Sequence, residues 1–452
     1  MSYGKRKVLI ISYVWPPMEG VGLMRAMKFV KYLPENGWEP IVLTIKAEKS
    51  AAQAGSIPSC DTKVFRSDYR DVAGEIKRLF SVKRARCGND GHNEAARKGC
   101  EKSRRSPSFI REMVLIPDDQ IGWYKFAVDE GRKIVGREGV DLIISTSPPE
   151  TAHLIGRALK KAFNIPWVAD LRDLWSEDHF RERPFIKKLV LRRIEKTVLK
   201  DADRVVTVSE PWAETLRLSL GAGKNKVEVI ENGFDEEDFG KAVYGGNKKF
   251  TISYTGKLHA DKQPVAGLFK ILKDLIGEGR IDRDRIQVDF YVMGYAKPDI
   301  SEMARSYGLN GVVFEHGMVD YKRSLEIQRV SDVLLFIQWQ GRGGDGWYSA
   351  KIYDYIGSGR PILALAGKRG IVADLISETS SGIMAEDEVS LREALLKLYC
   401  EHVENGFVKY TGNEANIANH SRKMRARKLA ALLDSVITKG LGDGSVRKVK
   451  DE

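Results

Sequence analysis

The sequence is poor in cysteine and has no long apolar run. Its four cysteines are scattered without the CxxC spacing of a zinc knuckle or a redox pair, and they are Cys60, Cys87, Cys100 and Cys400. This spacing argues against a zinc knuckle and a disulfide framework. No stretch reaches the ~20 consecutive apolar residues of a membrane-spanning helix, and the N-terminus has no signal-peptide cleavage pattern. We therefore expect a cytoplasmic protein.

Acidic residues are outnumbered by basic ones, and the excess is uneven. The net charge is +12 over 452 residues. One concentration lies in a loop at about 77–107 that is poor in apolar residues, and its members are Lys77, Arg78, Lys83, Arg84, Arg86, Arg97, Lys98, Lys102, Arg104 and Arg105. Such a loop suits contact with anionic lipid or polyphosphate, and a solvated insertion is an equal alternative. Nucleic acid is disfavoured because the loop has no interleaved aromatic residues.

Apolar runs alternate with amphipathic stretches along most of the chain. Val8 to Ser12, Met24 to Leu33 and Ile41 to Ile45 predict a strand, a helix and a strand of a parallel sheet. After the polar, Gly-rich stretch Ala242 to Lys249, the alternation starts again at Thr251 to Tyr254. We predict an α/β fold of two Rossmann-like, doubly wound domains. Because open sheets bind ligands at the carboxyl ends of their strands, the cleft between the domains is the expected site.

The length and this pattern also predict the divisions of the chain. They are an N-terminal domain at 1–241, a C-terminal domain at 242–415, a terminal helix at 416–439 that packs back on the N-terminal domain, and a flexible tail at 440–452.

Glycine turns follow the first strand of each domain. Gly20 and Gly22 precede a helix whose first amides would attract a phosphate or sugar oxygen, although an ordinary strand-to-helix turn is an equal alternative. In the second domain Gly256 is followed by Lys257 and, five residues later, by Lys262. Two ammonium groups at the carboxyl end of a strand suit a diphosphate, with a solvated lysine pair as the alternative.

A third candidate segment runs from Gly346 to Pro361. We predict Ser349 as the N-cap of a short helix that ends at Gly357 to Gly359. Lys351 in its first turn would bind an anion, and Asp354 would accept hydrogen bonds from ribose hydroxyls. Capping and core packing are the alternative roles.

This segment resembles the nucleotide-binding motif of glycosyltransferase family 4, a retaining family with the double-Rossmann GT-B fold. The family motif has two glutamates separated by seven residues, followed by a run such as Cys-Gly-Lys-Pro before a strand. Asp354 to Pro361 matches its second half, so the resemblance implies that Asp354 holds the ribose. The first glutamate is replaced by Gly346, which leaves Asp345, one residue earlier, as the candidate contact to the transferred sugar.

The resemblance extends over most of the chain. Lys257 and Lys262 fall where the family has an Arg and a Lys on the donor diphosphate, and Gly20 and Gly22 match its acceptor-side glycine loop. Asn232 to Asp235 is similar to the Asn-Gly-Val-Asp that precedes the family's linker.

Charged residues after a central strand are the catalytic candidates. Where many family members have a histidine, this chain has Asp170, Arg172 and Asp173. Asp170 or Asp173 would orient an acceptor hydroxyl or receive its proton, and Arg172 would reach donor phosphate; we favour Asp173. A cluster that pairs internally is the alternative. His153, early in a helix, is expected to pack or cap rather than act as a base.

The resemblance implies a retaining, metal-independent glycosyltransferase that needs no cofactor beyond a UDP- or GDP-linked sugar. Its acceptor would be a saccharide or a lipid-linked sugar in surface polysaccharide or glycolipid synthesis. The helix expected from about Pro184 to Lys200 has a basic flank that suits peripheral docking on the cytosolic face of an anionic membrane. Two alternatives stay open: a nucleotide-sugar epimerase of the same fold, and a non-catalytic protein that binds membranes or nucleic acid.

Overall fold

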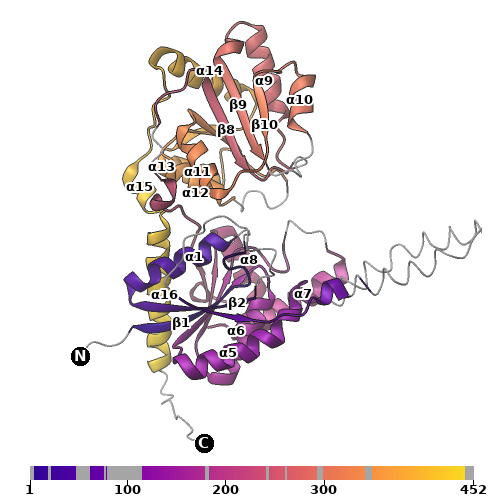
Figure 1. Cartoon of the computed structure of the whole chain (residues 1–452), viewed down its shortest axis with the longest axis vertical. Coiled ribbons are helices and arrows are strands. Elements are labelled where there is room, and N and C mark those ends of the chain that lie inside the picture. Colours follow the sequence, from indigo (N-terminus) through magenta and orange to yellow (C-terminus); the bar gives the residue numbers. More distant parts are fainter. Residues whose placement is uncertain are drawn as a thin grey trace, which may run out of the picture. The chain divides into compact units, whose positions relative to one another are not determined.

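The apolar runs of the N-terminal half form a parallel sheet in the computed structural model (Figure 1). Its strands lie in the order β3-β2-β1-β4-β5-β6-β7. Their bounds are β1 Arg6–Ile11, β2 Trp38–Ile45, β3 Lys63–Ser67, β4 Leu142–Ser147, β5 Trp167–Leu171, β6 Arg204–Thr207 and β7 Val227–Val229. The strand order reverses between β1 and β4, which makes the carboxyl ends of these two strands the switch point of the sheet.

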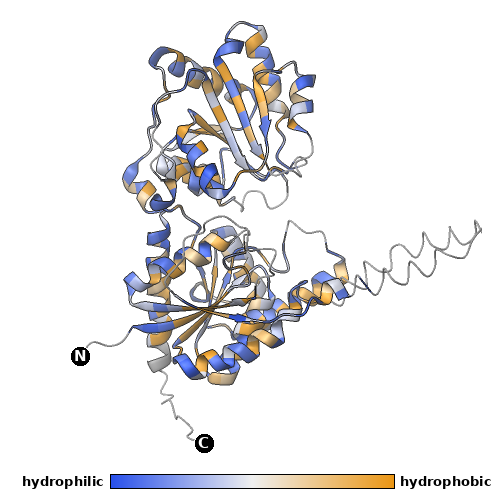
Figure 2. Ribbon diagram, in the orientation of Figure 1, coloured by the Kyte–Doolittle hydropathy of each residue, from blue (hydrophilic) through white to orange (hydrophobic). Residues whose placement is uncertain are grey.

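Helices cover both faces of this sheet. Their bounds are α1 Leu23–Tyr32, α5 Tyr124–Glu138, α6 Thr151–Phe163, α7 Phe185–Asp201 and α8 Glu210–Leu220. On one face, α1 and the C-terminal helix α16 (Arg422–Gly442) share a core with the strands, in which Phe29, Val8 and Leu429 are buried. Helices α5 and α6 pack against each other and against β2, β3 and β4. Figure 2 shows the matching pattern, with apolar strands inside and polar helix faces outside.

The second half builds a parallel sheet of the same kind. Its strand order is β10-β9-β8-β11-β12-β13, with the reversal between β8 and β11. The strand bounds are β8 Phe250–Gly256, β9 Ile286–Val292, β10 Val313–His316, β11 Val333–Ile337, β12 Ile362–Leu365 and β13 Gly382–Ala385. The helix bounds are α9 Ala266–Gly277, α10 Ile300–Ser306, α11 Tyr321–Val330, α12 Lys351–Gly357, α13 Ile371–Thr379, α14 Glu388–Asn405 and α15 Glu414–Ala418. The prediction of two Rossmann-like α/β halves is confirmed.

The chain divides into two compact units that differ slightly from the expected domains. One unit is Met1–Ile230 with Ala426–Glu452, and the other is Glu231–Arg425. The expected boundary at 241/242 lies later than Ile230, because Phe234 and Phe239 are already buried in the core of the second unit. The structure describes residues 5–18, 22–46, 62–75, 78, 115–178, 183–240, 244–259, 262–292, 299–341 and 349–442.

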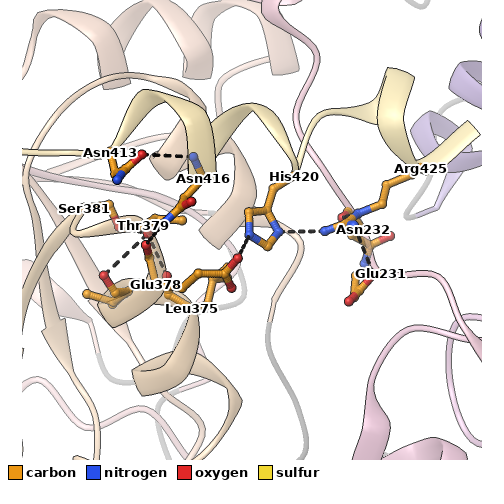
Figure 3. A network of polar contacts seen from close by, with 11 residues as sticks. Glu231, Asn232, Leu375, Glu378, Thr379, Ser381, Asn413, Asn416, His420 and Arg425 are labelled. Atoms are coloured by element: carbon orange, nitrogen blue, oxygen red, sulfur yellow. Dashed lines mark hydrogen bonds and ion pairs between the residues drawn. The ribbon is translucent and has the colours of Figure 1, made fainter. Parts of the chain in front are cut away.

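The segments that lead into and out of the second unit lie side by side. Phe234 and Ser421 form an isolated parallel bridge, in which the Arg422 amide donates to the Phe234 carbonyl at 2.7 Å. Figure 3 shows the side chains beside this bridge: His420 lies between Glu378 and Arg425, with Nε2 at 3.3 Å from Glu378 Oε1 and Nδ1 at 2.6 Å from Arg425 Nη2. Arg425 donates through Nε to the Asn232 carbonyl at 3.3 Å.

This bridge also corrects the predicted terminal helix. The sequence predicts one helix from 416 to 439, but the structure has α15 ending at Ala418 and α16 starting at Arg422. The helix is interrupted because the His420 carbonyl and the Arg422 amide bond to Phe234 instead of to their own helix. From Ala426 onward α16 belongs to the first unit. Among the described residues, no helix is long and apolar enough to span a bilayer.

Candidate functional site

In the second unit, one candidate site forms at the carboxyl end of β8. This strand pairs with β9 on one side and β11 on the other, so its end lies at the switch point. Gly256 has a φ of +106°, and a Cβ atom there would lie 3.3 Å from Nζ of Lys351. Both the backbone conformation and the close approach of Lys351 therefore favour glycine at this turn.

Lys351 reaches this turn from the first residue of α12. Its Nζ donates to Tyr254 Oη at 2.7 Å and lies 4.0 Å from the centroid of the Tyr254 ring. A longer contact of 3.3 Å joins Nζ to the Lys257 carbonyl. Burial lowers the pKa of Lys351 to about 7. An anion bound beside it would raise that pKa again, so a bound phosphate would favour the protonated, positively charged form of Lys351.

The two predicted diphosphate lysines lie on the loop after β8, which is held to the end of β11. Gln263 accepts a hydrogen bond from the His259 amide at 3.1 Å and donates to the Ile337 carbonyl at 2.6 Å. The Lys262 carbonyl accepts from the Gln340 amide at 2.7 Å. The Lys257 side chain is exposed and that of Lys262 is partly exposed. Within the described part of the chain neither ammonium group has an ion-pair partner.

Asp354 lies one turn into α12. Its Oδ1 accepts a hydrogen bond from the Tyr321 hydroxyl, at the start of α11, at 3.2 Å. Burial raises the pKa of Tyr321, and the charge of Asp354 raises it further. The structure therefore places Asp354 beside a hydroxyl donor, in a side-chain position that is only partly buried.

Ser349 and Asp345 precede α12 in the sequence. The N-cap of α12 is Ala350 and not Ser349, so the prediction for Ser349 as a cap is wrong. Ala350 already has helical dihedral angles of −53° and −24°, and the Ser349 carbonyl accepts from the Ile352 amide at 3.1 Å. Asp345 lies outside the described residues.

In the first unit, Asp170 is part of a buried ion pair. Arg25 donates to Asp170 Oδ1 through Nη2 at 2.8 Å and to Oδ2 through Nε at 3.1 Å, while Thr146 donates to Oδ2 at 2.9 Å. Burial by itself would raise the pKa of Asp170, but Arg25 and Thr146 outweigh it and hold the pKa below its ordinary value. Both carboxylate oxygens are thus engaged within the protein. This geometry matches the internal-pairing alternative for Asp170 and not contact with an acceptor.

Arg172 lies against the glycine turn after β1. Its Nε donates to the Ser147 carbonyl at 2.8 Å and its Nη2 to the Pro148 carbonyl at 2.8 Å. Gly22 has a φ of +88°, and a Cβ atom there would lie 0.8 Å from Arg172 Nη1. The turn accepts only glycine while the guanidinium group keeps this place. Gly20 lies outside the described residues.

Asp173 lies next to Arg172 and is partly buried. Burial lowers the pKa of Arg172, and the charges of Asp173, Asp170 and Glu150 oppose that shift. The side chain of Asp173 therefore lies in the field of a cation at the carboxyl end of β5. The structure brings Gly22, Arg172 and Asp173 together at this edge of the first sheet.

His153 packs in the core, as expected. It is fully buried, its Nδ1 lies 2.8 Å from Ser145 Oγ, and burial lowers its pKa to about 3. Trp175 and Trp167 lie at ring-centroid distances of 6.1 and 6.4 Å. A histidine that stays neutral and inaccessible does not act as a base.

Several residues of these sites were not found from the sequence. They are Arg25, Tyr254, Gln263 and Tyr321. Arg25 stands on the expected helix after the glycine turn, and a charged residue among apolar helix positions is the signal that could have marked it. The basic loop at about 77–107 lies outside the described residues, apart from Arg78.

One protein-family model matches part of this sequence. Residues 24–233 match the family model described as "Glycosyl transferase 4-like domain". A comparison with curated protein sequences gave no match.

The solved structures that are similar over nearly the whole chain include the following three. A glycosyltransferase from Rickettsia africae ESF-5 has a TM-score of 0.55 at 12% identity, covering 98% of both chains. Anabaena Alr3699/HepE in complex with UDP and glucose has a TM-score of 0.52 at 12% identity, covering 97% of this chain and 98% of the other. A putative UDP-N-acetylglucosamine 2-epimerase from Listeria monocytogenes has a TM-score of 0.51 at 13% identity, covering 96% and 97%. At these identities the likeness shows the fold.

Three findings agree on the fold: the two sheets with their switch points, the family match and the structural neighbours. The chain therefore has the GT-B fold, and the predicted resemblance to glycosyltransferase family 4 is confirmed for residues 24–233, which match a glycosyl transferase 4-like domain.

Proposed function

We propose that this chain transfers a sugar from a UDP- or GDP-linked donor to a saccharide or lipid-linked acceptor with retention. The observation that carries the proposal is the lysine cluster at the end of β8, where Lys257, Lys262 and Lys351 lie at a switch point. The proposed setting is surface polysaccharide or glycolipid synthesis in the cytoplasm. No further cofactor and no metal ion take part in the proposed reaction.

The donor side of the proposal follows from charge. When the bond between the sugar carbon and the diphosphate breaks, its electron pair leaves with the nucleoside diphosphate, so negative charge grows on the phosphates. Lys257 and Lys262 would neutralise that charge, and Lys351 would take up a proton beside it. Asp354 would hold the ribose. The complex of HepE with UDP and glucose, which shares this fold, supports a nucleotide in such a protein.

The acceptor side of the proposal uses the first unit. The acceptor oxygen forms the new bond to the sugar carbon, and Asp173 would orient its hydroxyl group or receive its proton. Arg172 is held by the Ser147 and Pro148 carbonyls and would fix the position of Asp173. Asp170 is a structural residue in this account, because Arg25 and Thr146 occupy its oxygens.

An epimerase is the second candidate, because the Listeria neighbour of the same fold is named as one. An epimerase would turn over a nucleotide sugar with no acceptor. A transferase would release nucleoside diphosphate only when an acceptor is present.

The discriminating experiment incubates the full chain with UDP- and GDP-sugars, with and without a set of saccharide and lipid-linked acceptors. Released nucleoside diphosphate and the anomeric configuration of the product are measured. Acceptor-dependent release with an unchanged anomeric configuration is expected. A new nucleotide sugar formed without acceptor would favour the epimerase, and an inverted product would contradict retention.

A further inference from the structure

Helix α7 of the first unit exposes a cluster of large apolar side chains. Phe185, Ile186 and Leu189 are 75, 55 and 51% exposed. Spacings of one and four residues put all three on one side of the first turns of the helix. The opposite side of α7 is anchored in the protein through Leu191, Val198 and Leu199, which are buried. The apolar side chains are therefore presented on a preformed helix.

The exposed side continues with basic residues. Arg192, Arg193, Lys196 and Lys200 are exposed, and they follow Leu189 at helical spacing on the same side. In the described part of the structure their side chains form no ion pair. This side is therefore apolar at its start and cationic along the rest of its length.

Acidic side chains near α7 are already engaged or turned inward. Glu195 is buried and accepts a hydrogen bond from Ser176, and Glu177 pairs with Lys188 at 2.8 Å. Asp201, at the end of the helix, pairs with Arg157 at 2.6 Å and with Lys161 at 2.9 Å. None of the exposed residues of α7 is acidic. Among the residues that the structure describes, no acidic side chain pairs with the basic residues of this side.

We propose that this α7 face, defined by Phe185, Ile186, Leu189, Arg192, Arg193 and Lys196, docks on an anionic phospholipid bilayer. The apolar side chains would enter the boundary between headgroups and acyl chains, and the basic side chains would bind lipid phosphates. Charge complementarity argues for an anionic lipid surface. The basic side chains match its negatively charged headgroups, and the exposed apolar side chains match the acyl chains beneath them. The inference does not depend on the proposed function, since it concerns binding alone.

Vesicle flotation with the full chain tests this docking. Vesicles of phosphatidylcholine with phosphatidylglycerol are compared with pure phosphatidylcholine, at low salt and at about 0.5 M salt, where surface charges are screened. Binding is expected only to the anionic vesicles and is expected to fall with salt. The combined change Arg192→Gln with Lys196→Gln should weaken partitioning by about fivefold per charge. Phe185→Ser with Leu189→Ser should weaken it by about tenfold or more.

Matched control variants lie in the same unit. Leu218→Ser removes a side chain that is 84% exposed on α8, and Arg132→Gln with Arg137→Gln removes two exposed charges on α5. These controls should bind vesicles like the wild type. Circular dichroism and nucleotide binding should be unchanged in every variant, which separates a failure of docking from a failure of the donor site.

Three results would overturn the proposal. They are equal binding to neutral vesicles, α7 variants that bind as well as the controls, and a wild-type chain that self-associates through this face in sedimentation experiments while ignoring vesicles. The last result would assign the α7 face to a second copy of the chain.

Discussion

At the carboxyl edge of the first sheet, Arg25 and Asp170 are each 2% exposed and bonded to one another, whereas at the same edge of the second sheet the Lys257 side chain is exposed. Both edges lie at a switch point, where open α/β sheets bind ligands. In the first unit the Arg25 and Asp170 charges pair with each other inside the protein. In the second unit the Lys257 and Lys262 ammonium groups have no ion-pair partner among the described residues. The two regions should therefore respond differently to the removal of a charge.

The largest expected effect is on the buried pair. Asp170→Asn removes the carboxylate charge that pairs with the buried Arg25 guanidinium, so the free energy of unfolding should fall by about 3 to 5 kcal/mol. Lys257→Ala, at the exposed edge, should stay within about 0.5 kcal/mol of the wild type. Urea unfolding of both variants measures the contrast. Similar losses in the two variants would show that the edges do not differ in this way.

Next in size is the effect of Asp173 on turnover. Asp173→Asn should lower turnover by roughly 10²-fold or more while donor affinity changes little, because the proton would lose its acceptor. Asp129→Asn, an exposed carboxylate on α5, is the control and should behave as the wild type. Turnover and donor binding are measured on the same preparations. Unchanged turnover would remove Asp173 from the reaction.

Glycine substitutions then measure how tightly the first edge is packed. Gly22 and Gly37 have φ angles of +88° and +83°, but only Gly22 faces a neighbour within 4 Å. Gly37→Ala should cost about 1 to 2 kcal/mol of stability through backbone strain alone. Gly22→Ala should cost a further ~1 to 3 kcal/mol, because Arg172 must leave its carbonyl partners. Equal costs in thermal unfolding would mean that Arg172 is not held there.

The smallest expected effect is a pH dependence of donor binding. The pKa of Lys351 is about 7 without ligand, and a bound diphosphate would raise it. Above pH 7 binding therefore takes up a proton, and affinity should fall as pH rises, by less than about tenfold per pH unit.

Titration calorimetry at pH 8 in two buffers of different ionisation enthalpy measures that proton uptake. Lys351→Met should abolish the pH dependence, and Lys273→Ala, an exposed lysine on α9, should keep it. An affinity that does not change between pH 7 and 9 would exclude the proposed role of Lys351.

The sequence predicted the sheets well, because apolar runs such as those of β1 and β8 are long and regular. It placed the first boundary too late, since the burial of Phe234 in the second unit depends on contacts with distant residues such as those of α12 and α13. The break between α15 and α16 was missed for the same reason: it is made by a bridge to Phe234 that no local pattern encodes.

The candidate sites were predicted in part. A candidate that directly follows a predicted strand, such as Lys257, can be identified from its position in the sequence alone. Asp170 and Asp173 are three residues apart and similar in sequence context, yet Asp170 is buried and bonded to Arg25, whereas Asp173 is only partly buried. Pairing partners far apart in the chain, including Arg25 with Asp170 and Lys351 with Tyr254, need the fold itself.

Calorimetric binding of UDP, GDP and ADP at fixed moderate salt tests the central claim most directly. One nucleotide should bind to the wild type, and Lys257→Ala should weaken that binding by about 1.5 to 3 kcal/mol, as expected for loss of a hydrogen bond to a charged group. Lys273→Ala should bind normally. If no nucleotide binds, or if Lys257→Ala binds as tightly as the wild type, the end of β8 is not a donor site.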